Sequence, residues 1–420
     1  MITNELKPGQ LLFAKLEIDL DEVPIEKLAA YTAVKYYLTV EDEPPDDVTN
    51  LEQVKRYLQS FDHLCEMEAW EAASEILLSY THTTTNQELR IQLRIWRYYR
   101  ELASLYNRIL GKLNSRWDAI CLNGLGLVYY GLGEYTHAIE FYQQCLAIAR
   151  ATGDQHREGR ALGNLGLTFY AMGQYHQAIK YTHQYLQKSR TIGDSQGEGN
   201  ALGNLGIIYK ALGKYHRAIN YAQQHLDIAR KIGDRLGEGN ALGNLGTAHY
   251  PLGKYHQAID YAQQHLDIAR AIGDRLGEGN ELANMGLAYH AIGEYTHAIA
   301  LYQQRLTITQ VIGDRQGEGE TLCRLGATLI RLDLYSEALK ALHTSLEICN
   351  TTGNRSIQAE VQKILAEAYQ ILGPRTLAIE YCNRALSIAA ELGIPLVKEC
   401  QELKEKLLSQ KAYRGNTNDN

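Results

Sequence analysis

Residues Gly199–Glu238 read GNALGNLGIIYKALGKYHRAINYAQQHLDIARKIGDRLGE, and the next forty, Gly239–Glu278, read GNALGNLGTAHYPLGKYHQAIDYAQQHLDIARAIGDRLGE. The two stretches differ at 8 of 40 positions and align without a gap. The register continues in both directions, because Ala recurs every forty residues from Ala138 to Ala378. A fixed period of this length is typical of repeat architectures. The sequence predicts seven such units over residues 119–398.

Each unit predicts two helices. Apolar residues recur every three to four positions over Leu202–Leu212 and again over Tyr215–Ala229, which is helical periodicity. We expect Gly206 and Ala218 to leave room for the two helices to approach, at a cost of about 1 kcal/mol for a helical Gly. In the Gly-Asp pair at 233–234, Gly suits a left-handed C-cap and Asp the N-cap of the next helix. The fold class predicted is all-α, a right-handed α-solenoid of stacked helix–turn–helix repeats.

The unit resembles the tetratricopeptide repeat. The residues that carry the resemblance are Asn204-Leu205-Gly206, Tyr209, Gly213, Tyr215, Ala218 and Ile219. Two features differ: the unit has 40 residues rather than 34, and Arg230 stands where the family usually has a helix-closing proline. The longer unit is similar to Pins-type polarity adaptors and to bacterial, especially cyanobacterial, multi-repeat proteins. The resemblance implies a protein that binds other proteins or peptides.

The two ends are less regular than the array. Residues 1–50 form an acidic segment with one expected helix, Ile25–Leu38, followed by an EDEPPDD linker at 41–47. Residues 51–118 form a degenerate helical region, in which Leu51–Tyr80 keeps the repeat spacing and Gln87–Leu113 is expected to be one long helix. Residues 399–420 complete the chain: we expect a capping helix over Lys398–Lys411 and a frayed tail from Ala412.

Charge and hydropathy narrow the class of protein. The net charge of −7 lies entirely in residues 1–50, which hold 11 acidic and 4 basic residues. The remainder is balanced and has no basic stripe, so we expect no nucleic-acid binding. No stretch reaches the roughly 18 unbroken apolar residues of a membrane helix, and the N-terminus lacks a signal pattern. We expect a cytoplasmic protein without a membrane partner.

Motifs for catalysis or cofactor binding are weak. The glycines of the junction at 237–246 mimic a dinucleotide loop, but they recur in helical register and follow no strand. His176, His216 and His256 are forty residues apart and cannot share one metal ion, so histidines are interpreted as solvated helix residues. The 7 cysteines are scattered and odd in number, which favours buried thiols in a reducing compartment. We therefore expect no enzyme activity, no cofactor and no metal.

The resemblance also implies where a ligand would bind. In the family, the first helix of each pair lines the concave surface, and ligand contacts occupy fixed positions along it. Carried onto this chain, those positions form pairs four residues apart, on one face of each helix. They are Arg160 and Asn164, Asn200 and Asn204, Asn240 and Asn244, Asn280 and Asn284, and Glu320 and Arg324. Further along the same helices, Tyr170, Lys210, Tyr250 and His290 would discriminate side chains. A carboxamide can bridge the N–H and C=O of an extended peptide.

Duplication alone could also reproduce Asn every forty residues. Five of the 8 differences between the two near-identical units fall in Ile207–Ala211 and its counterpart Thr247–Pro251, and three of those positions (207, 210 and 211) should face the groove. This divergence fits a surface tuned to a ligand, and it also fits drift on a tolerant wall. Pins-type proteins tend to carry Arg where this chain has Asn200, Asn240 and Asn280, so a strong preference for acidic peptides is not expected.

The function predicted is a non-catalytic scaffold that binds an extended peptide or a partner helix in the groove. Two alternatives stay open. The chain is a peptide-responsive regulatory sensor with residues 1–118 as its output, or it is the detached repeat portion of a larger signalling ATPase or protease system.

Overall fold

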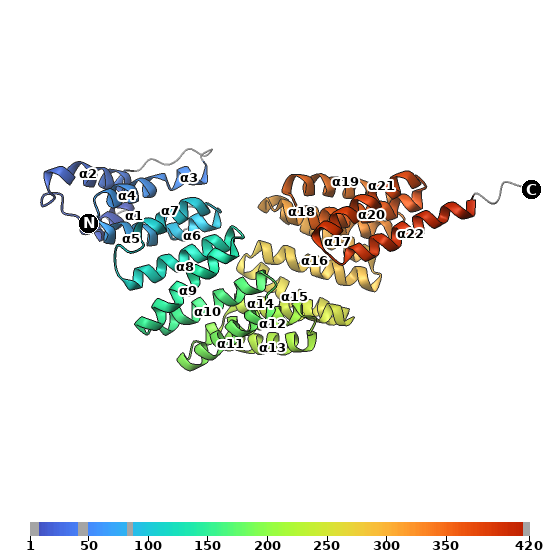
Figure 1. Cartoon of the computed structure of the whole chain (residues 1–420), viewed down its shortest axis with the longest axis horizontal. Coiled ribbons are helices and arrows are strands. Elements are labelled where there is room, and N and C mark those ends of the chain that lie inside the picture. Colours follow the sequence, from blue (N-terminus) through green and yellow to red (C-terminus); the bar gives the residue numbers. More distant parts are fainter. Residues whose placement is uncertain (1–7, 41–48, 82–86, 415–420) are drawn as a thin grey trace, which may run out of the picture. The chain divides into compact units, whose positions relative to one another are not determined.

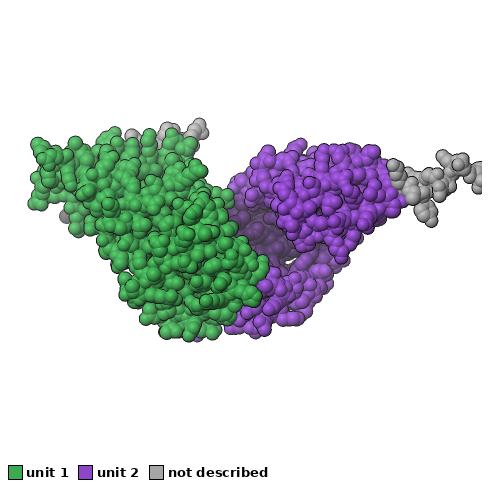
Figure 2. Space-filling model, viewed as in Figure 1, with its two compact units in different colours: residues 1–204 green, residues 205–420 purple. Residues whose placement is uncertain are grey.

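The computed structural model describes residues 8–40, 49–81 and 87–414, and within them every regular element is a helix (Figure 1). The only other pairing in these ranges is an isolated β-bridge between Tyr80 and Glu88. The chain divides into two compact units, residues 1–204 and 205–420 (Figure 2), and the boundary falls within helix α12. The prediction of an all-α solenoid of helix–turn–helix repeats is confirmed.

The forty-residue period appears as seven helix pairs, whose first helices begin at residues 115, 155, 195, 235, 275, 315 and 355. The pairs are α8 (Ser115–Gly131) with α9 (Tyr135–Thr152), α10 (Gln155–Ala171) with α11 (Tyr175–Ile192), α12 (Ser195–Ala211) with α13 (Tyr215–Ile232), α14 (Arg235–His249) with α15 (Tyr255–Ile272), α16 (Arg275–Ile292) with α17 (Tyr295–Ile312), α18 (Arg315–Ile330) with α19 (Tyr335–Thr352), and α20 (Arg355–Leu372) with α21 (Arg375–Leu392). A 3-10 turn, η1 (Tyr250–Leu252), follows α14 because Pro251 has no N–H to extend the helix. Inside each unit, a second helix packs against its own first helix and against the next one, as α15 does with α14 and α16.

The small residues between paired helices do not all have the role expected of them. A Cβ added to Gly286 would lie 2.5 Å from the ring of Tyr302, so this glycine is required. A Cβ on Gly206 would have ordinary contacts, the nearest being the carbonyl oxygen of Ala218 at 3.5 Å. The expectation that Gly206 is needed for close approach is therefore wrong. The reason is that Ala222 occupies the place that Tyr302 has in the other repeat, so the bulk is missing from the opposite helix.

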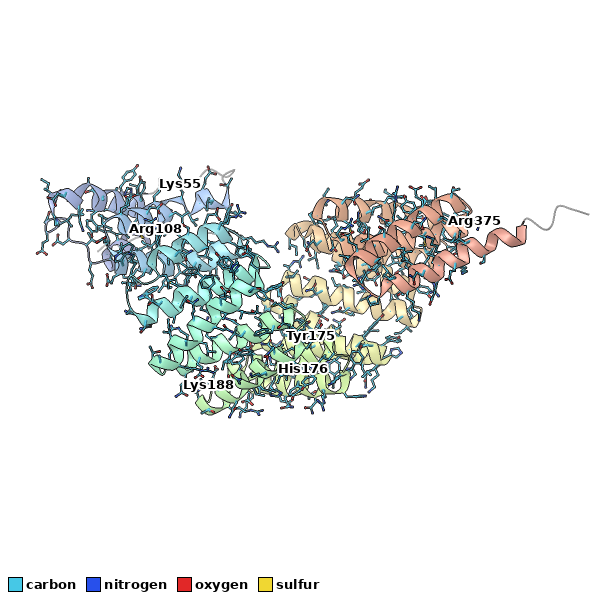
Figure 3. The ribbon with its side chains drawn as sticks, viewed as in Figure 1. Lys55, Arg108, Tyr175, His176, Lys188 and Arg375 are labelled. Atoms are coloured by element: carbon cyan, nitrogen blue, oxygen red, sulfur yellow. The ribbon has the colours of Figure 1, made fainter. Side chains whose placement is uncertain are left out.

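The N-terminal part of unit 1 is built from short helices around a shared apolar core. They are α1 (Pro8–Lys15), α2 (Ile25–Thr39), α3 (Asn50–Gln53), α4 (Lys55–Glu66), α5 (Trp70–Leu78), α6 (Leu89–Ile95) and α7 (Tyr99–Ile109). The helix expected at Ile25–Leu38 is confirmed as α2, whereas α1 was not expected. Helices α4 and α5 pack as a pair, with Phe61 and Ile76 fully buried. Arg108 of α7 donates hydrogen bonds to Asp62 of α4 and ties the two helices together (Figure 3). The expected linker at 41–47 lies outside the described residues.

The single long helix expected over Gln87–Leu113 is wrong, because the chain forms α6 and α7 there. Arg97 adopts a left-handed conformation with φ 63°. The N–H of Tyr98 then bonds to the C=O of Leu93 at 2.9 Å, which closes the turn as a glycine C-cap would. Apolar residues continue at helical spacing through this turn, and the turn contains no glycine or proline. The sequence therefore gave no sign that the helix is interrupted here.

The C-terminal helix α22 (Leu396–Arg414) packs against α20 and α21 and caps unit 2. Arg375, at the start of α21, donates to the backbone C=O groups of Leu407 and Leu408 (Figure 3). The expected capping helix is confirmed. It also extends further than expected, since Ala412 to Arg414 are helical rather than frayed; residues 415–420 lie outside the described part.

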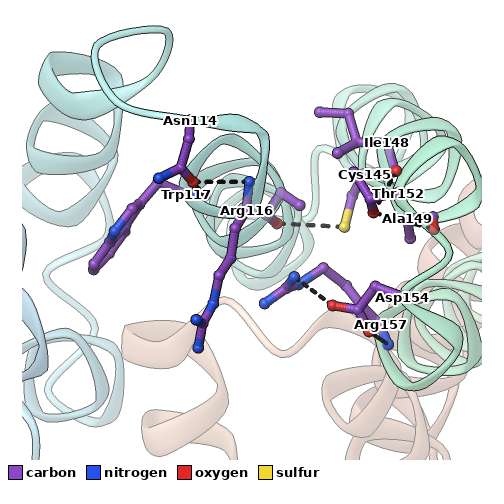
Figure 4. A network of polar contacts seen from close by, with 10 residues as sticks. Asn114, Arg116, Trp117, Cys145, Ile148, Ala149, Thr152, Asp154 and Arg157 are labelled. Carbon is purple, nitrogen blue, oxygen red and sulfur yellow. Dashed lines mark hydrogen bonds and ion pairs between the residues drawn. The ribbon is translucent and has the colours of Figure 1, made fainter.

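Side-chain caps fix the start of the first helices. Asn114 accepts hydrogen bonds from the N–H groups of Arg116 and Trp117, and Asp154 accepts one from the N–H of Arg157 (Figure 4). Gly153, in front of Asp154, has φ 71° and ends α9 in the left-handed conformation. The predicted Gly-Asp junction is confirmed, and it recurs at Gly233 and at later repeats.

At the position of the family's closing proline, an arginine pairs with a glutamate across the junction in four repeats, at Arg150, Arg190, Arg230 and Arg270. Arg230 Nε lies 2.9 Å from Oε1 of Glu238, and Arg235 pairs with the other oxygen of the same carboxylate. In unit 1, Glu158 binds Arg150 and also Lys188, the latter at 2.8 Å (Figure 3). In these four repeats the lengthened second helix therefore ends in an ion pair that fastens it to the next repeat, and in a later repeat Gln310 donates a hydrogen bond to Glu318 instead.

Candidate functional site

Two polar pockets open on the faces of the first helices, one in each unit. The unit 1 pocket has a volume of about 410 Å³ and the unit 2 pocket about 310 Å³. Each is described below from its own unit. Their linings include most of the residues to which the sequence pointed.

The unit 1 pocket combines carboxamides with two cations. Its lining is Arg94, Leu127, Arg160, Gly163, Asn164, Leu167, Tyr185, Asn200 and Asn204. Asn164 Nδ2 donates to Oδ1 of Asn123 at 2.9 Å, which leaves the Asn164 oxygen available to a ligand. No carboxylate among the residues that the structure describes contributes to the lining, so Arg94 and Arg160 give this pocket a positive charge. Arg94 comes from α6, where the sequence gave no reason to expect a site residue.

The unit 2 pocket is more polar and carries both signs of charge. It is lined by Lys210, Asn240, Gly243, Asn244, Thr247, His265, Asn280, Glu281, Ala283, Asn284, Leu287, Arg305, Glu320 and Arg324. Glu320 accepts from Arg305 Nη2 at 3.1 Å and from Arg324 Nη2 at 2.5 Å. Burial pushes the pKa of Glu320 upward, but the two guanidinium groups outweigh it and hold the pKa below its usual value. Glu320 is therefore a carboxylate at neutral pH.

The two near-identical repeats meet inside this pocket at positions where they differ. Lys210 Nζ donates to Oγ1 of Thr247 at 3.0 Å, and both residues lie in the divergent five-residue block. Burial lowers the pKa of Lys210, and the charge of Glu281 acts in the opposite direction. On Glu281, Oε1 accepts from Asn284 Nδ2 at 3.2 Å.

Some pocket residues come from second helices, which the sequence analysis did not predict. His265 of α15 lies against α14, where an added Cβ on Gly239 or Gly243 would be 2.8 Å from its ring. Because these glycines have no side chain, the imidazole reaches the first-helix face and comes to 3.0 Å from Oε1 of Glu281. Arg305 of α17 passes Gly279 in the same way, with its Cγ 3.9 Å from a Cβ placed there.

The same arrangement occurs in unit 1. Tyr185 of α11 lies 3.0 Å from a Cβ placed on Gly163 of α10, and it lines the unit 1 pocket. Tyr185, His265 and Arg305 occupy equivalent repeat positions. We call this set the second-helix row.

Three predicted residues line neither pocket. Tyr170, Tyr250 and His290 pack against the tyrosine that opens the next helix, with ring centroids 6.0, 5.3 and 5.3 Å apart respectively. His290 Nδ1 also lies 2.9 Å from Oγ1 of Thr328. These side chains stabilise the turn of the repeat.

The interpretation of histidines as solvated holds for only part of the set. His176, at the start of α11 (Figure 3), is exposed, as are His216 and His256. His225, His249 and His265 are buried; Gly239 and Gly243 leave the space for the ring of His265, and His249 packs against Tyr261 with its Nδ1 2.8 Å from the C=O of Leu245. No cluster of His, Cys, Asp and Glu that could hold a metal ion occurs among the residues that the structure describes.

A family model of the tetratricopeptide repeat matches residues 97–151, 118–190, 157–231, 197–271 and 237–310, which overlap to cover half of the chain. No curated protein sequence matches. In the described ranges, no helix combines the length and apolar character that a membrane crossing requires.

Among the solved structures with similar folds are two whose names include a sensor and one of a Rap protein with a bound factor. One is a signal transduction ATPase with numerous domains that has a tetratricopeptide repeat sensor, from Pyrococcus horikoshii: TM-score 0.61, 16% identity, covering 96% of this chain and 65% of that one. A Rap protein complexed with competence and sporulation factor gives TM-score 0.55 and 16% identity, covering 81% and 99%. The quorum sensor NprR from B. thuringiensis gives TM-score 0.55 and 17% identity, again covering 81% and 99%. At these identities the likeness concerns the fold.

Proposed function

This chain belongs to the tetratricopeptide repeat family, and from that premise we propose that it is a non-catalytic interaction scaffold which binds an extended peptide on the first-helix faces. The observation that carries the proposal is the paired carboxamides of the unit 2 pocket. Asn240 and Asn280 are exposed, while Asn244 and Asn284 are half-buried at the pocket wall. Each pair can accept from a peptide N–H and donate to a peptide C=O.

The rigidity of the repeats also supports peptide binding. Capped junctions and interhelical ion pairs hold the first helices in place before a ligand arrives, so little conformational entropy is lost on binding. The two pockets differ in charge, since one has only cations and the other has both signs. The two pockets would therefore prefer peptide segments of different charge. Lys210 and Thr247 both lie at positions where the two near-identical repeats differ, and the two side chains are hydrogen-bonded to each other. This contact favours the interpretation that the divergent block is adapted to a ligand rather than the result of neutral drift.

The test uses the full chain and peptides selected from a displayed random library. We expect a consensus motif to emerge, and the affinity of its synthetic peptide to fall at least about tenfold when Asn244 and Asn284 are both changed to Ala, given about 1 kcal/mol for each lost hydrogen bond. Asn220→Ala, on the exposed face of α13, is the matched control and should leave the affinity unchanged. Circular dichroism checks that each variant folds. Equal affinity in the wild type and the double variant would contradict the proposal.

A second candidate is a peptide-responsive sensor, favoured by the apolar core that joins the N-terminal helices to the first repeat pair. Residues from Val34 to Val128 form one buried cluster, which could couple to an output partner. The fold likeness to the Rap protein and to NprR is compatible with this role, and the likeness to the ATPase sensor is compatible with a detached repeat subunit. A sensor would change its small-angle scattering curve when the selected peptide binds. A simple scaffold would not.

A further inference from the structure

The unit 2 pocket contains buried charged side chains whose hydrogen bonding is incomplete. Four atoms in its lining have no hydrogen-bond partner among the described residues: His265 Nδ1, Glu281 Oε2, Arg305 Nη1 and Arg324 Nε. The side chains of Glu281 and Arg305 are only 5% and 6% exposed. An unmet hydrogen bond on a buried group destabilises the fold, and more so when the group is charged. A ligand that completes these bonds would relieve that destabilisation.

On the α18 side of the pocket the unmet groups are donors. Arg305 and Arg324 share one carboxylate, Glu320, so this cluster keeps one positive charge in excess. The N–H groups on Arg305 Nη1 and Arg324 Nε have no acceptor. Guanidinium groups favour a planar carboxylate, which can accept two N–H bonds at once. This side calls for an anionic group with two oxygens.

On the side of the pocket that faces α14, the unmet group is an acceptor, the carboxylate of Glu281 from α16. Glu281 Oε1 has Asn284 and the nearby His265, but Oε2 has no donor. His265 Nδ1 is 3.0 Å from Oε1 without the alignment of a hydrogen bond. Lys210 supplies positive charge nearby, but its ammonium donates to Thr247. This side calls for a donor, and an ammonium suits a buried carboxylate best.

We propose that the unit 2 pocket binds a free α-amino acid. The ligand's carboxylate would meet Arg305 and Arg324, and its ammonium would meet Glu281. Asn280 and Asn284, on α16 between the two sides, would bond to the remaining lone pairs and N–H groups. The unmet atoms lie just behind the pocket surface, so binding requires a change of rotamer in these side chains.

Other ligands complete less of the site. The backbone of an internal peptide segment brings neither charge, and the terminal group at one end of a peptide brings only one of the two; side-chain charges stand several bonds away from the backbone and do not place a carboxylate and an ammonium on one carbon. The volume of about 310 Å³ suits a single small molecule. The proposal goes beyond peptide binding, since a chain without a peptide partner would still bind the amino acid.

The experiment titrates each of the twenty L-amino acids into the full chain by calorimetry. We expect at least one to bind. Its N-acetyl derivative, which lacks the ammonium, and its amide derivative, which lacks the carboxylate, should each bind at least about tenfold more weakly, as loss of one charged hydrogen bond implies. Arg305→Met and the isosteric Glu281→Gln should reduce affinity by a similar factor. Arg315→Met and Glu294→Gln make the same chemical changes at exposed positions and should have no effect.

Three outcomes overturn the proposal. If no amino acid binds, the pocket is only structural. If the N-acetyl derivative binds as tightly as the amino acid, the pocket is a general anion site. If a short peptide that ends in the same residue binds more tightly than the free amino acid, the pocket is a site for C-terminal chain ends. Circular dichroism verifies folding, and Glu281→Gln keeps the test valid if Arg305→Met does not fold. Peptide affinity, measured with the Asn244/Asn284 variant, is a separate readout, so each proposal can fail without the other.

Discussion

Gly243 of α14 lies directly against the ring of His265, since a Cβ on this glycine would be 2.8 Å from Nδ1 of the imidazole. Real side chains do not approach so closely. The glycine therefore does more than allow two helices to pack. It opens a passage through which a residue of the second helix reaches the ligand-facing surface of the first.

Gly243→Ala should destabilise the protein even though Ala is the better helix former. The added methyl must displace a buried ring, which costs about 1–3 kcal/mol, against a gain of about 1 kcal/mol in helix propensity. Gly206→Ala is the matched control, because its Cβ would have only ordinary contacts at 3.5 Å. Chemical denaturation should show a lower unfolding free energy for Gly243→Ala and an unchanged or higher one for Gly206→Ala. If Gly206→Ala is the less stable of the two variants, the steric argument is contradicted.

The cysteines should resist thiol reagents until the protein unfolds. All seven are free and buried. Burial raises the pKa of the Cys121 thiol to about 12 and that of Cys145 to about 11, so the reactive thiolate is scarce at neutral pH. We expect slow labelling of the native chain at pH 8 and fast labelling of seven thiols in denaturant. Rapid labelling of the native chain would show that a helix pair opens readily.

The repeat architecture was predictable because its signals are local. Gly233 and Asp234 follow one another in the chain, and their capping roles need no tertiary information. The positions of Asn244 and Asn284 followed from the family's register, since residues at fixed positions of stacked first helices share a face. Both features depend on spacing alone.

The rest of the site depends on contacts that spacing does not reveal. His265 and Arg305 belong to second helices, and the family's ligand positions were carried over only for first helices. The available signal was the glycine pair at 239 and 243, four residues apart on one helix face and opposite a variable position. Arg94 was missed because the turn at Arg97 has no glycine or proline to mark it.

Stability should depend on the charge of Glu320. Its pKa is lowered in the folded chain, so the carboxylate stabilises the fold above its unfolded pKa of about 4.5, and this contribution is lost as the pH falls through the folded value. Glu320→Gln leaves Arg305 buried without a counter-charge and should cost about 3 kcal/mol at pH 7. The difference in unfolding free energy between the variant and the wild type, measured by chemical denaturation across pH, should become smaller below pH 4.5. A difference that does not change with pH would mean that the carboxylate charge contributes nothing to stability.

The second-helix row should accept an aromatic ring only where the facing first helix has two glycines; the flexible Arg305 passes Gly279 and Ala283 without needing a second glycine. Position 265 faces Gly239 and Gly243, the same pair that accommodates Tyr185 in unit 1 as Gly159 and Gly163. His265→Tyr should therefore fold with a change in unfolding free energy of about 1 kcal/mol or less, as for a volume-tolerant substitution.

Ser345 occupies the equivalent position two repeats later, but it faces Gly319 and Cys323 rather than two glycines. Its hydroxyl is fully buried and donates to the C=O of Gly319 at 2.6 Å. Ser345→Tyr should cost about 3 kcal/mol, because the ring has no passage and the hydrogen bond is lost. The test compares the denaturation midpoints of the two tyrosine variants with that of the wild type. If His265→Tyr and Ser345→Tyr are equally destabilised, the glycine pair does not determine which side chains reach the pocket.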